Sequence, residues 1–144
     1  MSEIKIATIE DVDEIMEMSK QFLSTTGYTE YSDEQTIRNL INTVITGQQN
    51  EMIILLIPGT GFIAGQSSPF AFGSHFLASE IAWWVNEDKR KSGAGTELID
   101  AFEYWAKHVA GCTIITLTSL DDEVGKLYEK KGYKLYERAY MKEL

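Results

Sequence analysis

Cysteine is nearly absent from this chain of 144 residues, in which Cys112 is the single example. One thiol excludes an intramolecular disulfide and any metal site built from several cysteines, and its position beside an apolar stretch favours a small buried side chain. Long apolar runs are also missing, since the longest, Met52 to Ile57, is far too short to span a membrane. The first residues lack the basic start and apolar core of a secretory signal. These absences favour a cytoplasmic protein that does not enter a membrane.

Positive charge is also scarce, because 13 lysine and arginine residues stand against 22 aspartate and glutamate residues and leave a net charge of −9. A charge of this size keeps a protein in solution and disfavours unguided contact with nucleic acid. It favours a cationic substrate such as an amine. The length fits one domain over residues 1–144, and the hydrophobic content of 44% is that of an ordinary globular protein with a buried core.

Apolar periodicity predicts strands and helices in succession along the chain. Ser32, with Gln35 three residues later, predicts a capping box at the start of the second helix. Ser67 to Phe70 is expected to break or bend the extended run that precedes it. The predicted elements, in order, are a strand at 4–9, helices at 12–24 and 33–47, strands at 52–57, 62–66 and 80–85, a helix at 95–107, a strand at 113–118, a helix at 121–132, and a last strand or bent hairpin at 133–144.

Residues 80–99 form a strand that feeds a charged turn with two glycines, and the turn opens an amphipathic helix. The first N–H groups of a helix have no internal partners, and the helix dipole adds partial positive charge there. Gly93 and Gly95 lack side chains, so an anion such as phosphate can approach the backbone closely. Arg90 and Lys91 add positive charge just before the glycines. We call residues 90–96 the glycine loop and expect it to be an anion site.

Two motifs resemble those of the GNAT N-acetyltransferase superfamily. Residues 90–95 fit the signature Arg/Gln-x-x-Gly-x-Gly/Ala, and residues 127–133 are similar to the Leu-Tyr-Glu-Lys-x-Gly-Phe element at the expected distance downstream. The two motifs span roughly the last half of the chain. The resemblance implies an α/β fold with a central mixed twisted sheet of about six to seven strands flanked by about four helices. It also implies direct transfer of an acetyl group from acetyl-coenzyme A to a primary amine, with no metal.

In such a protein the glycine loop holds the pyrophosphate of acetyl-coenzyme A through its backbone N–H groups. The strand before the loop pairs with the pantetheine arm, and a backbone N–H near Trp84 or Val85 polarises the thioester carbonyl. Asp121 stands where the family often has an asparagine that touches pantetheine; aspartate can cap the helix but cannot donate through an amide. The expected cofactor-binding residues are Trp84, Val85, Arg90, Lys91, Ser92, Gly93, Ala94, Gly95, Thr96 and Asp121.

Two side chains are candidates for the catalytic steps. Tyr128 matches the tyrosine that protonates the departing thiolate in many relatives, and an ordinary phenol is protonated at neutral pH. The alternative is a core tyrosine on an amphipathic helix. Glu80 lies on the strand that leads to the glycine loop, where several relatives carry a glutamate that deprotonates the amine. Its offset from Arg90 differs by one residue from that pattern, which reverses its strand face unless a bulge intervenes. The alternatives are a carboxylate that faces solvent and a reaction without a dedicated base, because in many relatives the amine can lose its proton to bulk water.

The link between the first two helices forms one wall of the acceptor site in the family. Tyr28, Glu30 and Tyr31 are the candidate contacts there, and His75 is a candidate acceptor-site or acid–base residue, with ordinary loop or structural roles as the alternatives. The acceptor is expected to be a small-molecule or peptide amine, and relatives often form homodimers. A GNAT-like domain that binds coenzyme A without catalysis is the alternative function. A Rossmann-type nucleotide module fits poorly, because no Gly-x-Gly-x-x-Gly run follows the first strand.

Overall fold

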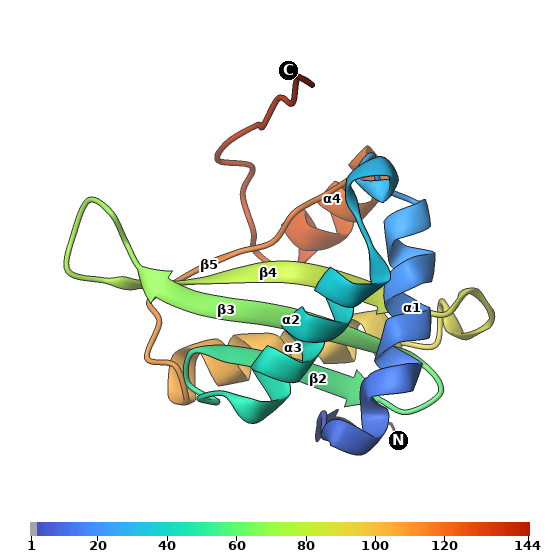
Figure 1. The fold of residues 1–144 in the computed structure, drawn as a ribbon. Coiled ribbons are helices and arrows are strands. Elements are labelled where there is room, and N and C mark those ends of the chain that lie inside the picture. The colour runs from blue at the N-terminus through green and yellow to red at the C-terminus, as the bar shows by residue number, and fades with distance from the viewer. Residues whose placement is uncertain (1–2) are drawn as a thin grey trace.

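The computed structural model describes residues 3–144 and contains a mixed sheet with helices on both faces (Figure 1). The elements are β1 (Lys5–Ile6), α1 (Val12–Ser24), α2 (Glu34–Thr46), β2 (Met52–Ile57), β3 (Gly61–Pro69), β4 (Phe76–Val85), α3 (Ala94–His108), β5 (Ile114–Thr116) and α4 (Asp122–Lys130), with short 3-10 helices η1 (Ile9–Asp11), η2 (Thr29–Tyr31) and η3 (Glu87–Lys89). The predicted order is confirmed from β1 through α4. Among the described helices, none has the length and apolar character needed to cross a membrane.

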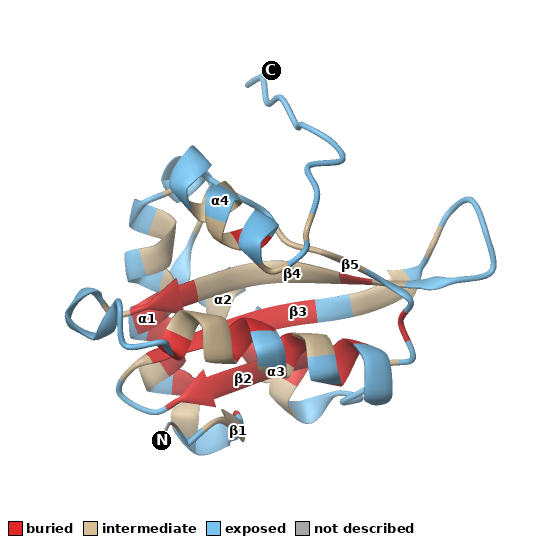
Figure 2. Ribbon diagram, turned by 180° about the vertical axis from the view of Figure 1, so that it is seen from behind, coloured by how far each residue is buried: buried red, intermediate tan, exposed pale blue. Residues whose placement is uncertain are grey.

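The five strands lie in chain order across the sheet, and every neighbouring pair is antiparallel except β4 and β5, which are parallel. The residues of β2 show how both faces are covered. Ile53, Leu55 and Ile57 pack toward α3, whereas Ile54 and Leu56 pack toward α1 and α2. Successive side chains of one strand thus enter two different cores, which explains the continuous apolar run of this strand. Figure 2 views the α3 face and shows buried residues along both the strands and the helix.

Three local features differ from the expected detail. Helix α2 is capped by Asp33 rather than by Ser32, because the Asp33 carboxylate accepts hydrogen bonds from the Thr36 N–H and hydroxyl, both at 2.8 Å. The expected break at 67–70 falls late in that range, because β4 pairs with β3 as far as Pro69 and the strand ends there. The first strand is also shorter than expected, with only two residues.

The expected last strand is absent. Residues 133–144 follow α4 without forming a strand or a helix, so the sheet has five strands rather than about six to seven. Leu135 and Tyr136 are adjacent, and Ala139, Tyr140 and Met141 form a run, so the segment has no apolar face with a period of two. Its side chains are largely exposed, Tyr140 by 92%. Figure 1 shows this segment leaving the body of the protein beside α4.

Candidate active site

Strands β4 and β5 separate in the middle of β4, and we call this point the fork. Their parallel pairing runs from Leu77 opposite Ile114 to Ser79 opposite Thr116 and then stops. β4 continues to its end, paired there only with β3. Along residues 80–85, one edge of β4 therefore faces no other strand in the described part of the chain. An extended molecule could pair with that backbone edge in the way that an added strand would.

A bulge in β4 decides which way Glu80 faces. The register with β3 shifts between Ala64 and Gly65, and Ile81 has no residue of its own opposite it. In a regular strand Glu80 and Trp84 would point to the same face, since they are an even number of residues apart. With the bulge they point to opposite faces, and Trp84 enters the core under α1 and α2. The bulge thus compensates for the one-residue offset of Glu80 from the family pattern.

Glu80 and Tyr128 meet at one residue, Thr118, which follows β5. The Thr118 N–H donates to Glu80 Oε1 at 3.1 Å, and the Thr118 carbonyl accepts from the Tyr128 hydroxyl at 2.9 Å. The two candidate catalytic side chains therefore lie beside one another at the fork, although helix α3 and strand β5 separate them in sequence. Thr118 could not be identified from the sequence, because it acts through backbone groups that every non-proline residue carries.

The environment of the fork changes the acidity of both side chains. Withdrawal from water raises the pKa of the Glu80 carboxyl to about 7, while the hydrogen bond from the Thr118 N–H opposes part of that rise. Burial also raises the pKa of the Tyr128 phenol, and the nearby carboxylates of Glu80 and Asp121 raise it further. Glu80 can therefore gain or lose a proton near neutral pH, whereas Tyr128 stays protonated there.

Two aromatic side chains flank Tyr128. Its ring centroid lies 5.9 Å from that of Trp83 and 5.9 Å from that of Tyr133. The Trp83 indole Nε1–H donates to the Gly95 carbonyl at 3.2 Å, and the Tyr133 hydroxyl donates to Glu103 Oε2. Neither Trp83 nor Tyr133 is among the site residues predicted from the sequence. An apolar strand pattern marks an aromatic residue as core, and only the position of Tyr128 shows that this part of the core borders the site.

The glycine loop carries a row of backbone N–H groups without acceptors. Lys91 and Gly93 have φ values of 69° and 91°, a left-handed conformation that glycine adopts freely and lysine at a cost of about 1–2 kcal/mol. Ser92 Oγ accepts from the Ala94 N–H at 3.3 Å. Within residues 3–144, no acceptor is found for the N–H groups of Lys91, Ser92, Gly93, Gly95 and Thr96. This arrangement fits an anion such as a pyrophosphate.

Arg90 contacts the end of β4. Its Nε donates to the Val85 carbonyl at 3.0 Å, and its Cζ lies 4.6 Å from the centroid of the Trp84 ring. The Trp84 and Val85 side chains are buried, and the Trp84 Nε1–H donates to Asn86 Oδ1 at 2.9 Å. A ligand at this place would therefore meet the backbone of Trp84 and Val85 rather than their side chains. The charge that Arg90 would add to a bound phosphate stays a prediction.

Asp121 is the N-cap of α4, because its Oδ1 accepts from the Val124 N–H at 2.9 Å. The predicted capping role of Asp121 is thus confirmed, and its predicted contact with a cofactor stays a prediction.

Three acceptor candidates lie together between α1 and α2. Tyr28 precedes η2, and Glu30 and Tyr31 are part of it; all three residues are exposed. The Tyr31 hydroxyl donates to the Glu143 carboxylate, so the C-terminal segment contacts this wall. Their role in binding an acceptor stays a prediction.

His75 lies apart from the other candidates. It is an exposed residue of the β3–β4 hairpin, and its Nδ1 is 2.7 Å from Thr113 Oγ1. This hairpin and the glycine loop are at opposite ends of β4 (Figure 1). The structure brings Glu80 and Tyr128 together but does not bring His75 to them.

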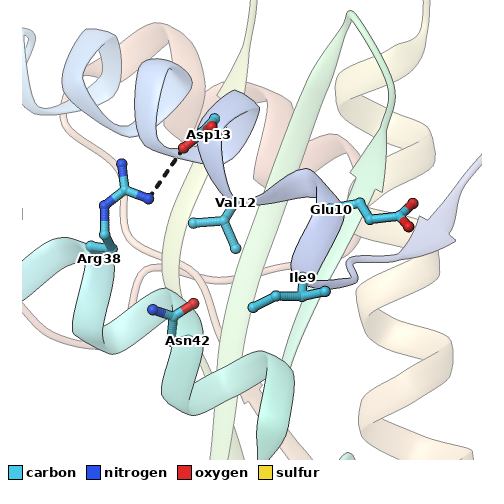
Figure 3. Close-up of a pocket in the computed structure, with 6 residues that line it drawn as sticks. All are labelled: Ile9, Glu10, Val12, Asp13, Arg38 and Asn42. Atoms are coloured by element: carbon cyan, nitrogen blue, oxygen red, sulfur yellow. Dashed lines mark hydrogen bonds and ion pairs between the residues drawn. The ribbon is translucent and has the colours of Figure 1, made fainter.

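Two open pockets lie outside the fork. One of about 390 Å³ adjoins the glycine loop and is lined by Lys89, Ser92 and Ala94 and by residues of the β2–β3 turn. The other, of about 280 Å³, lies between the start of α1 and α2, where Arg38 pairs with Asp13 at 3.1 Å (Figure 3). None of the predicted site residues lines this second pocket. No group of three or more histidine, cysteine or acidic residues within 3–144 could hold a metal ion.

Comparison with known proteins identifies the family of this chain. The family model described as Acetyltransferase (GNAT) family matches residues 14–133, which is most of the chain. The protein therefore belongs to the GNAT acetyltransferase family. A search of curated proteins found no match.

Solved structures share the fold over nearly the full chain. An aminoglycoside N-acetyltransferase in complex with CoA is 16% identical, with 100% of this chain and 95% of that chain covered and a TM-score of 0.78. An aminoglycoside 6′-N-acetyltransferase from Acinetobacter haemolyticus is 18% identical, with 99% of both chains covered and a TM-score of 0.74. A transcriptional regulator from Bacillus halodurans is 17% identical, with 100% of both chains covered and a TM-score of 0.79. At these identities the likeness shows only the fold, which is an α/β fold with a mixed β-sheet flanked by four helices.

Proposed function

We propose that this protein is an N-acetyltransferase that transfers an acetyl group from acetyl-coenzyme A directly to a primary amine. The observation that carries the proposal is the meeting of Glu80 and Tyr128 on either side of Thr118. A base for the amine, on the strand that leads to the glycine loop, and an acid for the leaving group, on α4, lie there beside the free edge of β4. Membership of the GNAT family supports the same reaction class.

The residues present fit coenzyme A. The free N–H groups of the glycine loop suit the pyrophosphate, and a Cβ built on Gly93 would meet only Glu97 Oε1 at 4.0 Å, so a ligand has room to approach. The unpaired edge of β4 at residues 80–85 suits the amide groups of the pantetheine arm. Asp121, at the start of α4, is the further candidate contact. A relative of the same fold is known as a complex with CoA.

When bound, acetyl-coenzyme A supplies an activated acetyl group and a thiolate as the leaving group. The amine attacks as the neutral free base, after its ammonium proton has passed to solvent. The Glu80 carboxylate, with a pKa of about 7, accepts the further proton that the nitrogen gives up as it bonds to the acetyl carbon. Tyr128 turns its hydroxyl from the Thr118 carbonyl and gives its proton to the sulfur as the carbon–sulfur bond breaks. Backbone N–H groups on the free edge of β4 donate to the carbonyl oxygen, where negative charge develops.

The acid and the base are coupled through charge. The ionised Glu80 carboxylate is one of the causes that raise the pKa of the Tyr128 phenol. When Glu80 takes the proton of the amine, its negative charge disappears, and the phenol becomes a stronger acid at the moment when the thiolate needs a proton. The charge of Glu80 thus adds to the burial that keeps Tyr128 protonated before the reaction, and loss of that charge helps Tyr128 to donate during the reaction.

The acceptor in this proposal is a cationic amine, either a small molecule or a peptide. The net charge of −9 and the exposed Tyr28, Glu30 and Tyr31 of the α1–α2 link support it. Two solved structures of the same fold are aminoglycoside N-acetyltransferases, which act on amino groups of polycationic molecules. Action in the cytoplasm belongs to the proposal and rests on the sequence.

The test combines binding and turnover. Calorimetry should detect coenzyme A binding, and a panel of amines with acetyl-coenzyme A should reveal acceptors by release of the free thiol. Spermine, aminoglycosides, free lysine and peptides with a free N-terminus cover the cationic classes, and a neutral alcohol series is the matched control. Coenzyme A binding without thiol release for any amine would support the alternative of a domain that binds coenzyme A without catalysis. Absence of coenzyme A binding would contradict both.

A further inference from the structure

Trp83 connects two parts of the candidate site that come from different helices. Its indole Nε1–H donates to the carbonyl of Gly95, in the first turn of α3, at 3.2 Å. Its ring centroid lies 5.9 Å from that of Tyr128 on α4, with 45° between the ring planes. The side chain is partly buried and packs against the core between the sheet and α3. One side chain of β4 therefore touches both the glycine loop and the candidate acid.

Gly95 is the residue that makes this contact possible. A Cβ built on Gly95 would lie 2.9 Å from Trp83 Cζ2, closer than Cβ atoms approach in real proteins, and 3.6 Å from Val85 Cγ2. The backbone of Gly95 is helical, so no left-handed conformation explains the glycine. Gly93, in contrast, has φ of 91° and open space around it. The first glycine of the motif serves the backbone turn, and the second admits the Trp83 indole.

We propose that Trp83 is a positioning residue that couples the glycine loop to the Tyr128 phenol, a role that rests on the proposed function. The indole N–H restrains the turn of α3 whose own N–H groups are free for the pyrophosphate. The ring face restrains the Tyr128 ring, whose hydroxyl reaches the fork. Phenylalanine could fill much of the same space but could not donate to the Gly95 carbonyl.

The first test is Trp83→Phe, measured by calorimetry and by steady-state kinetics. Loss of a hydrogen bond of this kind corresponds to a weakening of coenzyme A binding by about three- to tenfold, and kcat should fall as well. Trp105→Phe is the matched control. Trp105 lies in the second half of α3, donates its indole N–H to the Gln49 carbonyl and stacks on Phe102. The Trp105→Phe substitution makes the same chemical change away from the fork. It should leave both the dissociation constant for coenzyme A and kcat within about twofold of wild type.

The second test separates positioning from general packing by combining Trp83→Phe with Tyr128→Phe. If Trp83 acts on catalysis through Tyr128, its substitution should lower kcat in the wild-type background and by less than about twofold in the Tyr128→Phe background. Its effect on coenzyme A affinity should be the same in both backgrounds. An equal fall of kcat in both backgrounds would overturn the proposal. Gly95→Ala is the second variant should Trp83→Phe not fold, because it displaces the indole without removing it, and the same pattern is expected.

Fluorescence gives a readout that turnover does not. Coenzyme A binding should change tryptophan emission in wild type and in Trp105→Phe, and the change should be lost in Trp83→Phe. If the wild-type protein binds coenzyme A but Trp83→Phe leaves the affinity, kcat and the emission change unaffected, the positioning role alone is overturned. Wild-type protein that binds no coenzyme A would overturn the proposed function, and this inference with it.

Discussion

Replacing Glu80 with glutamine should change how the stability of the protein depends on pH. The Glu80 carboxyl has a pKa of about 7 in the folded protein, against its usual 4.5. Below pH 4.5 the folded and unfolded states both hold the proton. As the pH rises toward 7, the unfolded chain releases the proton while the folded protein keeps it, so the free energy of unfolding falls. Above pH 7 the folded protein carries a partly buried charge, and the loss is complete.

The size of this effect follows from the difference between the two pKa values. One pKa unit corresponds to 1.36 kcal/mol, so the shift corresponds to about 3 kcal/mol. This is an upper figure, because Glu80 keeps partial contact with solvent, which screens its charge. Glutamine has nearly the same shape, does not ionise, and keeps an oxygen that can accept from the Thr118 N–H. Glu80→Gln should therefore remove the pH dependence without removing the hydrogen bond.

The assay is urea unfolding followed by circular dichroism at several pH values between 4 and 8.5. Glu80→Gln and wild type should have similar free energies of unfolding at the acidic end, and the variant should be more stable by up to about 3 kcal/mol at the basic end. Glu129→Gln, an exposed position on α4, is the matched control and should follow wild type throughout. If the free energies of unfolding of Glu80→Gln and wild type change in parallel with pH, the reasoning about the buried carboxyl is wrong.

The same variant also has an expected effect on kinetics. Glu80→Gln should lose the acidic limb of the pH profile of kcat/KM near pH 7.

Three further substitutions test the loop, the acid and the helix start. Gly93→Val should abolish coenzyme A binding in calorimetry, because valine is strained at φ of 91° and covers the free N–H groups. Its far-ultraviolet circular dichroism spectrum should stay that of the folded protein, and an unchanged affinity for coenzyme A would exclude this site. Tyr128→Phe should lower kcat more than it raises the KM for acetyl-coenzyme A, and unaltered turnover would remove Tyr128 from the mechanism. Asp121→Ala should lower the free energy of unfolding by about 1 kcal/mol in urea titration, since the Val124 N–H loses its acceptor; an unshifted midpoint would show that the cap contributes nothing.

What could be predicted from the sequence is local. The glycine loop needs residues with unusual backbone freedom at fixed positions, and a run such as Met52 to Ile57 is apolar because both of its faces are covered, so these features are visible in the chain itself. The fork is different, because it depends on where β5 stops pairing with β4, and no single segment records that. Residues 133–144 show the reverse case, in which the sequence predicts a strand that the structure does not form. The segment is rich in apolar residues but has no partner strand, and a strand depends on pairing rather than on composition.

The bulge at Ile81 is the feature that unites the site. Glu80 and Trp83 are three residues apart, so in a regular strand they would face opposite sides of the sheet. Either the candidate base would then turn away from the side where α3 and α4 lie, or the indole would no longer reach Gly95. The extra residue puts Glu80 and Trp83 on the same side, where one meets Thr118 beside the Tyr128 hydroxyl and the other meets the Tyr128 ring. One irregularity in one strand thus brings the candidate base, the candidate acid and the first turn of α3 to the same side of the sheet.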